Sequence, residues 1–322
     1  MITGASDLAQ YMALRSANGQ TSAKFEAAAA TVAEGKIQNL RASLQADFKP
    51  LNAVQNALSR LAAYSGVSTQ AAFFVDQQQS ALDMISDLST GLAQDLVAAH
   101  EAEATGTLDT ISEGARSAFT QAVSTLNYAA GGRYLFSGAN VTDAPLPAGE
   151  DMLATLEVEI AGMSHADAAS HIHAFFTDDA GGYAAAYTGA SDDRIAFTIA
   201  SGQTVRSDVT ALSPDLRQSL AAMATGALVS NADQAVTAGA DLLSGAQAIA
   251  DTRGTLGMVQ ERIETVQTRN GATATAMELR LAELTTPDMY EAATELENYE
   301  MALERLYLVT SRVSAMNFAE FM

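Results

Sequence analysis

Apolar positions recur every three or four residues along most of this chain, and that spacing predicts amphipathic helices. A helix is expected from about Ala5 to Asp47, with Gly19 and Gly35 as weak points because glycine is a poor helix former. Its apolar positions are Phe25, Ala28 or Ala29, Val32, Ile37, Leu40 and Leu44. The first part of the chain therefore predicts a long N-terminal helix.

A second helix is expected to begin at Pro50, because proline fits the first turn of a helix. Its apolar residues alternate in steps of three and four, a seam that favours packing against another helix. They are Leu51, Val54, Leu58 and Leu61, followed in the same rhythm by Leu82, Ile85, Leu88 or Ser89, Leu92, Leu96 and Ala99. A third helix is expected from Leu108 to about Asn127.

The helical pattern stops at the sequence YLFSGANVTDAPL, residues 134–146. Glycines release the preceding helix, a Ser-Gly pair favours a turn, and prolines keep helix from resuming. These residues are Gly131, Gly132, Ser137, Gly138, Pro145 and Pro147. Tyr134 and Phe136 are expected to fill the space at the end of the helix.

Between residues 150 and 212 apolar positions alternate with polar ones, and this period of two predicts strands. Ser164, with Asp167 three residues later, predicts the start of a short helix between them. The expected strands contain Leu156, Val158 and Ile160 in one case and Ile195, Phe197 and Ile199 in the other. A small mixed α and β unit is therefore expected within a helical protein.

Helices return at Ser213 and Pro214, which suit a helix cap and a first turn. The last helix is expected to begin at residues 286–288 and to carry one narrow apolar stripe. The stripe consists of Met289, Ala292, Leu296, Tyr299, Leu303, Leu306, Thr310 and Val313. A stripe this narrow needs a partner helix, which the N-terminal helices or other copies of the chain could supply.

The pattern as a whole predicts a mainly α fold: a long helical, coiled-coil rod formed by the N- and C-terminal halves, with a small inserted α+β domain. The expected parts are an N-terminal assembly segment (1–47), the N-terminal half of the rod (48–133), the inserted domain (134–212), the C-terminal half of the rod (213–285) and a C-terminal coiled-coil assembly segment (286–322). Tryptophan is absent and aromatic residues are few, which fits long helices with thin, shared cores.

The charge balance narrows the possible partners. The chain has 38 Asp and Glu against 17 Lys and Arg, a formal net charge of −21. A chain this acidic repels phosphate backbones and anionic lipids, so we expect no nucleic acid and no membrane partner. From Leu61 to Ala115 all charged side chains are acidic. We interpret this run as a solvated face, with an acidic docking surface as the alternative.

Residue types that carry chemistry are few. The absence of cysteine excludes disulfides, thiol nucleophiles and cysteine metal sites. His165, His171 and His173 with Asp167 are metal-ligand types, but positions 171 and 173 lie on different faces of a helix, which favours ordinary surface roles. No phosphate-binding glycine pattern is present. We therefore predict a protein that is not an enzyme and has no cofactor or metal.

Four segments, in order along the chain, together resemble the flagellin family. The first is GRYLFSGANVTDAPL at 132–146, and the second is YTG at 187–189, followed by Arg194, IASGQTV and RSDV. The third contains Arg253, Leu256, Gly257, Gln260, Arg262 and Ile263, and the fourth is TTPDMYEAATELENYEMALERLYLVTSRVS at 285–314. Within the family, the chain resembles the proteins that join the flagellar hook to the filament.

The resemblance implies a structural protein of the bacterial flagellum, located outside the cell and exported through the flagellar type III channel without a cleaved signal peptide. Its implied partners are other copies of itself, the neighbouring hook-associated protein, flagellin and a flagellar export chaperone. The terminal helices are expected to be disordered in the monomer and to form coiled coils on assembly. The expected assembly residues are Leu296, Tyr299, Leu303, Leu306 and Val313, with Leu51, Val54, Leu58 and Leu61 as candidate partners or, alternatively, as ordinary core.

Two other functions remain open from the sequence. A filament flagellin would grow long filaments by itself. A secreted adhesin-type binding module on a helical stalk would bind a host ligand through its insertion, and its terminal helices would be stably folded in the monomer.

Overall fold

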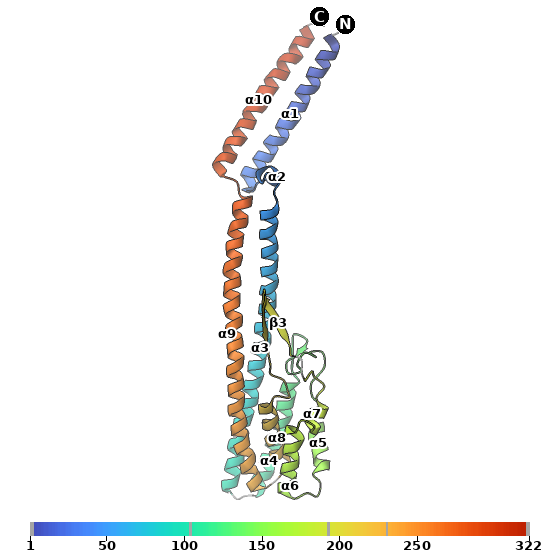
Figure 1. Cartoon of the computed structure of the whole chain (residues 1–322), viewed down its shortest axis with the longest axis vertical. Coiled ribbons are helices and arrows are strands. Elements are labelled where there is room, and N and C mark those ends of the chain that lie inside the picture. Colours follow the sequence, from blue (N-terminus) through green and yellow to red (C-terminus); the bar gives the residue numbers. More distant parts are fainter. Residues whose placement is uncertain (1–2, 103–104, 192–193, 230, 320–322) are drawn as a thin grey trace. The chain divides into compact units, whose positions relative to one another are not determined.

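The computed structural model describes residues 3–102, 105–191, 194–229 and 231–319 (Figure 1). The elements in chain order are α1 (Thr3–Glu34), α2 (Leu40–Ser43), α3 (Lys49–Ala102), α4 (Thr105–Leu126), β1 (Ala129–Ala130), β2 (Arg133–Tyr134), α5 (Gly149–Glu159), α6 (His165–Thr177), α7 (Gly182–Ala186), β3 (Ala196–Ala200), β4 (Gln203–Arg206), α8 (Pro214–Leu228), α9 (Ala232–Thr285) and α10 (Met289–Ala319). The prediction of a mainly α protein with long helices and small sheet elements is confirmed.

The chain forms two compact units. The smaller unit contains residues 1–60 and 272–322, and the larger unit contains residues 61–271. The larger unit holds nearly all of the buried apolar side chains. The five-part division expected from the sequence stays a prediction.

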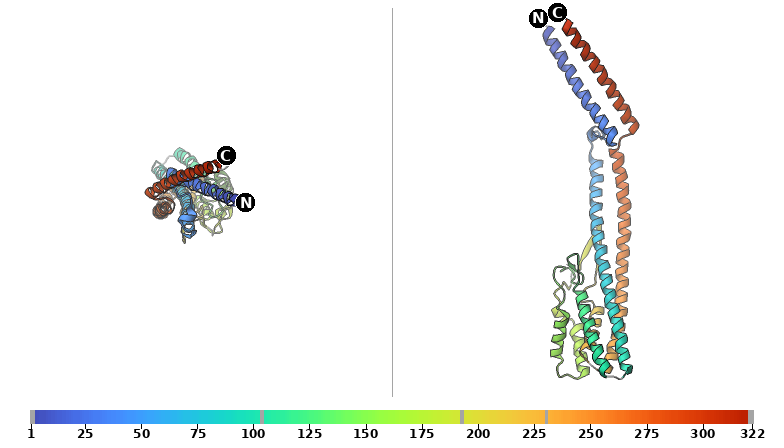
Figure 2. Two further views of the ribbon diagram at one scale, coloured as in Figure 1. Left: turned by 90° about the horizontal axis from the view of Figure 1, so that it is seen from above. Right: turned by 180° about the vertical axis from the view of Figure 1, so that it is seen from behind.

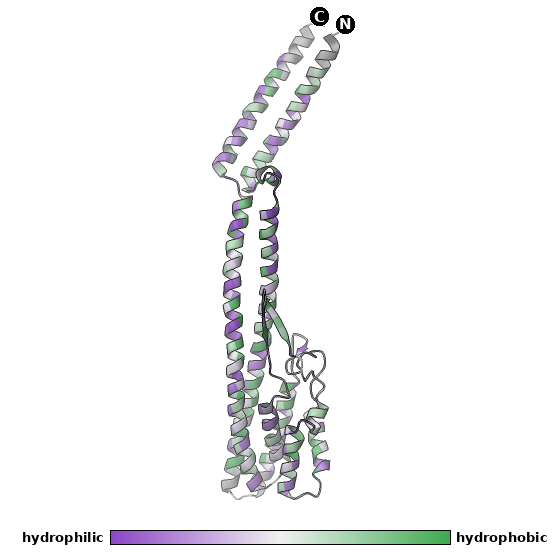
Figure 3. Cartoon of the chain, viewed as in Figure 1, coloured by the Kyte–Doolittle hydropathy of each residue, from purple (hydrophilic) through white to green (hydrophobic). Residues whose placement is uncertain are grey.

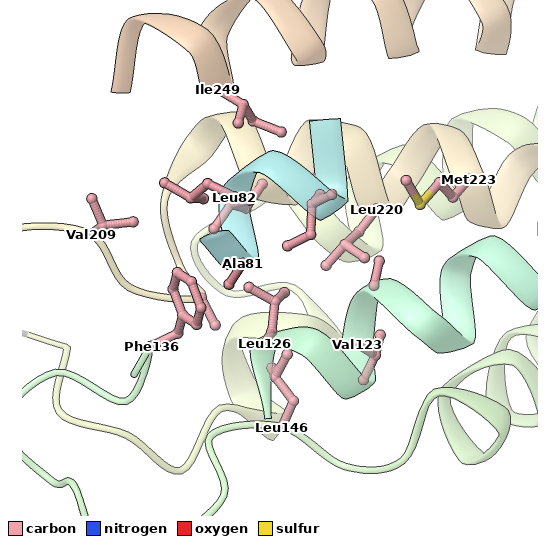
Figure 4. Packing of buried hydrophobic residues seen from close by; sticks show 14 of the residues in the cluster. Ala81, Leu82, Val123, Leu126, Phe136, Leu146, Val209, Leu220, Met223 and Ile249 are labelled. Atoms are coloured by element: carbon pink, nitrogen blue, oxygen red, sulfur yellow. The ribbon is translucent and has the colours of Figure 1, made fainter. Parts of the chain in front are cut away.

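Helix α8 lies at the centre of the larger unit and packs against α4 and α6. It begins as predicted, with Ser213 as the cap and Pro214 in the first turn. Its side chains are buried over most of its length, as expected for a helix surrounded by others. Figure 4 shows Leu220 and Met223 of this helix facing apolar side chains from α3, α4 and α9.

Buried polar side chains attach the connecting segments to the long helices. Gln78, on α3, donates a hydrogen bond to the carbonyl of Leu135 (2.7 Å) and accepts one from the Ser207 hydroxyl (2.5 Å). Asn270, on α9, donates to the carbonyl of Ile199 (3.0 Å). Because buried backbone carbonyls need hydrogen-bond partners, these amides hold the chain between α4 and α8 against the helices.

The Arg217 guanidinium, on α8, is buried at the end of α6. It donates hydrogen bonds to the carbonyls of Phe176 (2.5 Å) and Asp178 (2.6 Å) and lies 3.2 Å from the Asp179 carboxylate. The last carbonyls of a helix have no partner within the helix, and a cation there is favourable. Arg217 therefore fixes the end of α6 to α8.

The strand predicted around Leu156 is wrong, because residues 149–159 form helix α5. The buried positions are Gly149, Met152, Leu153 and Leu156, a spacing of three and four residues. Val158, expected to point inward, is 78% exposed. A window of three alternating apolar residues was too short to separate a strand from one helical turn.

The other predicted strand is confirmed: β3 pairs with β4 in an antiparallel hairpin, with Phe197 opposite Val205. The cap of α6 is confirmed as well, because Ser164 accepts a hydrogen bond from the backbone N–H of Asp167 (3.2 Å). The chain between α6 and β3 includes the short helix α7.

Two helix ends differ from the prediction. The first helix passes through Gly19 but ends at Glu34, because Gly35 takes a left-handed conformation (φ +65°) and only the short α2 follows. Helix α4 ends at Leu126, before the two glycines expected to release it. Gly131 and Gly132, both at positive φ, instead form the two-residue turn between β1 and β2.

The hydroxyls of two tyrosines bind backbone carbonyls within the larger unit. Tyr183 is fully buried and donates to the carbonyl of Ala211 (2.8 Å), and burial raises the pKa of its phenol. Tyr187 is half-buried and donates to the carbonyl of Phe136 (3.2 Å). Burial raises the pKa of Tyr187 to about 12, against an ordinary value of 10.0.

Gly149→Ala is expected to lower the free energy of unfolding by about 1–3 kcal/mol. A Cβ at Gly149 would lie 2.9 Å from the Cα of Thr120, and a backbone atom cannot move aside cheaply. The matched control is Gly254→Ala on α9, where a Cβ meets open space, and a gain of up to about 1 kcal/mol is expected. Urea unfolding of both variants tests the prediction, and equal stabilities would contradict it.

Tyr183→Phe is expected to cost about 1 kcal/mol at pH 7, because the carbonyl of Ala211 loses its partner. A buried tyrosine with a raised pKa stabilises the fold fully below the unfolded pKa near 10, and this stability is lost as the pH rises above that value. The variant should therefore lose about 1.4 kcal/mol less than the native chain between pH 9 and pH 11. Urea unfolding across that range measures the difference; an identical alkaline loss would rule out this contribution.

Candidate assembly surface

Helix α10 begins where the sequence predicts. The Asp288 carboxylate accepts hydrogen bonds from the backbone N–H groups of Tyr290 (2.8 Å) and Glu291 (3.3 Å). These groups have no partner within the helix, so an aspartate before the first turn stabilises the helix start. The Ile37 N–H donates to the Thr285 carbonyl (2.9 Å) and ties the chain after α1 to the end of α9.

Helix α10 lies beside α1, and the two run in opposite directions within the smaller unit (Figures 1 and 2). Among the described side chains of these two helices, the buried ones are Ala28 on α1 and Ala292 on α10. Burial of two methyl groups contributes little to the hydrophobic free energy. The pair therefore has a much thinner core than the larger unit.

The predicted stripe of α10 is half-buried. Leu296, Tyr299, Leu303 and Leu306 all lie between the buried and the exposed classes. Val313 lies in α10, but its side chain is outside the described part of the structure. The stripe is therefore only partly covered in a single chain.

Tyr299 makes the best-defined polar contacts of this stripe. The Lys24 ammonium of α1 lies 6.0 Å from the centre of its ring, at the limit of a cation–π contact. The Tyr299 hydroxyl donates to the Glu295 carboxylate (2.9 Å), and this hydrogen bond is the main cause of a raised Tyr299 pKa. Both contacts are solvent-accessible, so they orient the side chain more than they stabilise the pair.

The second group of predicted residues lies on α3. Leu51 and Val54 are buried, while Leu58 and Leu61 are half-buried. The structure gives α10 the N-terminal helix α1 as its neighbour, so a pairing of α10 with this group stays a prediction. The burial of Leu51 and Val54 agrees with the alternative that these two residues are ordinary core.

The structure also shows apolar residues of α10 outside the predicted stripe. Tyr290 is 84% exposed and Leu308 is 62% exposed, and Met301, Tyr307 and Val309 are exposed too; Met289, at the start of the stripe, is also exposed. Figure 3 shows apolar residues among polar ones along the two helices. The signal in the sequence was the run Tyr307-Leu308-Val309, which no single narrow stripe can contain because three consecutive residues spread over about 200° of the helix circumference. Together with the stripe, these residues form the candidate assembly surface.

The predicted metal-ligand types do not gather. The ring of His171 lies 2.9 Å from the Glu159 carboxylate, His173 contacts the Thr177 hydroxyl (3.2 Å), and His165 is exposed. In the part of the chain that the structure describes, no three such side chains could share a metal ion. No described helix has both the length and the apolar content to cross a membrane.

Two comparisons with known proteins give matches. Residues 229–322, the last 94 of the 322 residues, match the family model of the bacterial flagellin C-terminal helical region. A solved structure from Vibrio parahaemolyticus, provisionally described as a flagellar hook-associated protein, matches with a TM-score of 0.52 at 15% sequence identity. That match covers 74% of this chain and 97% of the other chain. No curated protein sequence gives a significant match.

The two similarities are of different kinds. The match to the solved structure shows a shared fold, and the family match covers all of α9 and α10. The candidate assembly surface on α10 therefore lies within the region that is similar to flagellins.

Amides of α1 and α10 are expected to exchange with solvent at least about a hundredfold faster than those of α8, because local opening of the thin pair exposes little apolar surface. Hydrogen exchange followed by mass spectrometry on the purified full-length monomer measures both regions in one sample. Equal protection of α10 and α8 would show that the terminal pair is a stable element and would favour the binding-module alternative.

Proposed function

We propose that this protein is a structural component of the bacterial flagellum that joins the hook to the filament, in the role of the third hook-associated protein. The observation that carries the proposal is the incompletely covered apolar surface of α10, which lies in the segment similar to the flagellin C-terminal region. The shared fold with a protein described as hook-associated supports it.

Assembly would complete the core that the single chain lacks. In one chain α10 has α1 on one side, and its remaining apolar residues face water. Helices from neighbouring copies would cover Leu296, Leu303 and Leu306 fully and would bury the exposed face around Leu308. Each large side chain that becomes fully buried contributes roughly 1.5–3 kcal/mol. Many weak helices would then form one stable bundle.

The partners follow from this position in the flagellum. Other copies of the chain would form the layer, the neighbouring hook-associated protein would contact it on the hook side, and flagellin would polymerise on the opposite side. Before assembly, an export chaperone would cover the apolar surface of α10, and the chain would leave the cell through the flagellar export channel without a cleaved signal. The role is mechanical, and it needs no catalysis and no cofactor.

Deletion of the gene in its host tests the role directly. The expected result is bare hooks in electron micrographs with abundant flagellin in the medium, because filament subunits are exported but cannot be seated. Bare hooks with no flagellin in the medium would mean that this chain is the filament subunit itself. Normal flagella would contradict both and leave the secreted binding module.

Complementation of the deletion tests the assembly surface. Leu303→Asp places a charge in the half-buried stripe of α10 and is expected to abolish rescue of filaments, because a buried unpaired carboxylate is costly. Leu243→Asp is the matched control, because this leucine is exposed on α9 in the larger unit, and full rescue is expected. Equal rescue by both variants, at equal export, would remove the stripe from the mechanism.

A further inference from the structure

The larger unit has an open groove between α3 and α4. One part, of about 600 Å³, is lined by Leu88, Gly91 and Leu92 of α3 and by Gly114 and Ala118 of α4. A second part, of about 390 Å³, continues along the same two helices to Tyr128. Met84 lines both parts, and Met84 and Tyr128 are each about half exposed. The groove thus has an apolar floor that faces water.

The rim of this groove is acidic. Asp83, Asp87 and Asp95 line it. Along α3, Asp87 follows Asp83 by about one helical turn, and Asp95 follows Asp87 by about two. All three are exposed, and Asp83 forms an ion pair with Arg253 at 2.5 Å. The groove therefore offers carboxylates to a basic partner above a floor that suits apolar side chains.

The floor is open because two glycines line it. A Cβ at Gly91 or at Gly114 would meet no atom within 4 Å. Neither glycine is needed for close packing within this chain, and glycine inside a helix costs about 1 kcal/mol relative to alanine. The space above them is therefore available to a side chain from outside.

The chain also contains a segment with the opposite charge. Residues 36–60 carry four basic residues and one acidic residue, Asp47, in a chain whose net charge is −21. The basic residues are Lys36, Arg41, Lys49 and Arg60, and all four are exposed. Half-buried apolar residues accompany them, among them Leu44 and Phe48.

The backbone of this segment is strained at one place. Gln45 and Ala46 both have positive φ angles, of 50° and 62°, which residues other than glycine rarely adopt. Strain of this kind costs about 1–3 kcal/mol per residue and often marks a functional segment. Here it shapes the turn between Arg41 and Lys49.

We propose that the basic segment 36–60 of one copy docks into the acidic groove between α3 and α4 of a second copy. This inference rests on the proposed function in one respect, since an assembly of many copies needs a contact between neighbours. Arg41 and Lys49 pair with Asp87 and Asp95, and apolar side chains of the segment enter the space above Gly91 and Gly114.

Charge complementarity favours this occupant over a random contact between copies. Two chains of charge −21 repel each other over most of their surfaces. Association is therefore favoured where a basic surface of one copy contacts an acidic surface of the other. The contact is heterologous, because the segment and the groove are different surfaces, and each copy can therefore bind one neighbour on each side. Rows of copies follow from a contact of this kind.

Sedimentation velocity of the purified full-length chain tests the contact. At about 0.05 M salt we expect association that increases with protein concentration, and at about 0.5 M salt we expect it to be at least tenfold weaker, since salt screens exposed charges. A chain that stays monomeric at about 0.05 M salt, at concentrations up to roughly a hundred micromolar, overturns the proposal.

Three matched variants locate the contact. Asp87→Asn with Asp95→Asn in the groove, and Arg41→Gln with Lys49→Gln in the segment, are each expected to weaken association at least tenfold. The control, Asp251→Asn with Glu261→Gln, also removes two negative charges, but from exposed positions on α9, and it should leave the association unchanged. Equal loss in the groove and control variants overturns the proposal.

A mixture of the groove variant and the segment variant tests whether the segment of one copy binds the groove of another. The groove variant keeps a basic segment, and the segment variant keeps an acidic groove, so an equimolar mixture is expected to form dimers that grow no further. Gly91→Leu is a second groove variant that changes no charge, at a position where a Cβ meets no atom within 4 Å, and it should abolish association while it keeps the stability of the fold. No dimer in the mixture, or undiminished association of Gly91→Leu, overturns the proposal.

This experiment is independent of the test of flagellar function. Groove-dependent association together with normal flagella in the deletion strain would keep the contact and remove the flagellar role. Bare hooks in the deletion strain together with no groove-dependent association would keep the role and remove the contact.

Discussion

A long helix with one narrow apolar stripe is not stable alone in water, and the structure depends on how each stripe is covered. In the larger unit the main stripes are covered: α8 is enclosed by α4 and α6, and the stripe of α3 containing Leu82 and Ile85 is buried. In the smaller unit α10 has only α1 beside it, and its leucines stay half-buried. The difference separates a part that is finished within one chain from a part that requires neighbours.

Buried polar side chains, together with apolar packing, hold the segments of the larger unit in place. The chain between α4 and α8 forms short helices and two-stranded hairpins, which are marginal on their own. Gln78, Arg217 and Asn270 bind carbonyls of these segments from inside the helical core. Each anchor satisfies a carbonyl that would otherwise be buried without a partner, so the inserted segments and the long helices share one core.

Acidic and basic side chains are concentrated in different segments of the chain. The acidic side chains that line the groove belong to the larger unit and the basic segment 36–60 belongs to the smaller unit. In the proposed contact, this separation would let like molecules bind each other despite a large common charge. Assembly through α10 would supply burial, whereas the groove would supply register between neighbours. In the proposed assembly, the terminal helices would reach their full stability only when many copies pack together.

The repeating steps of three and four residues were enough to predict the mainly α fold, the start of α10 at Asp288 and the stripe through Leu296 and Leu303, because helix caps and amphipathic spacing are local properties. The hairpin around Phe197 was also predictable from alternation. The helix at Leu156 was not, since only its packing against α4, where Gly149 lies close to Thr120, distinguishes one turn of helix from a strand. The choice of α1 as the partner of α10, the exposure of Leu308 and the groove beside Gly91 were likewise decided by the tertiary structure. Each of these depends on which surfaces remain uncovered after distant segments have packed, and no local spacing contains that information.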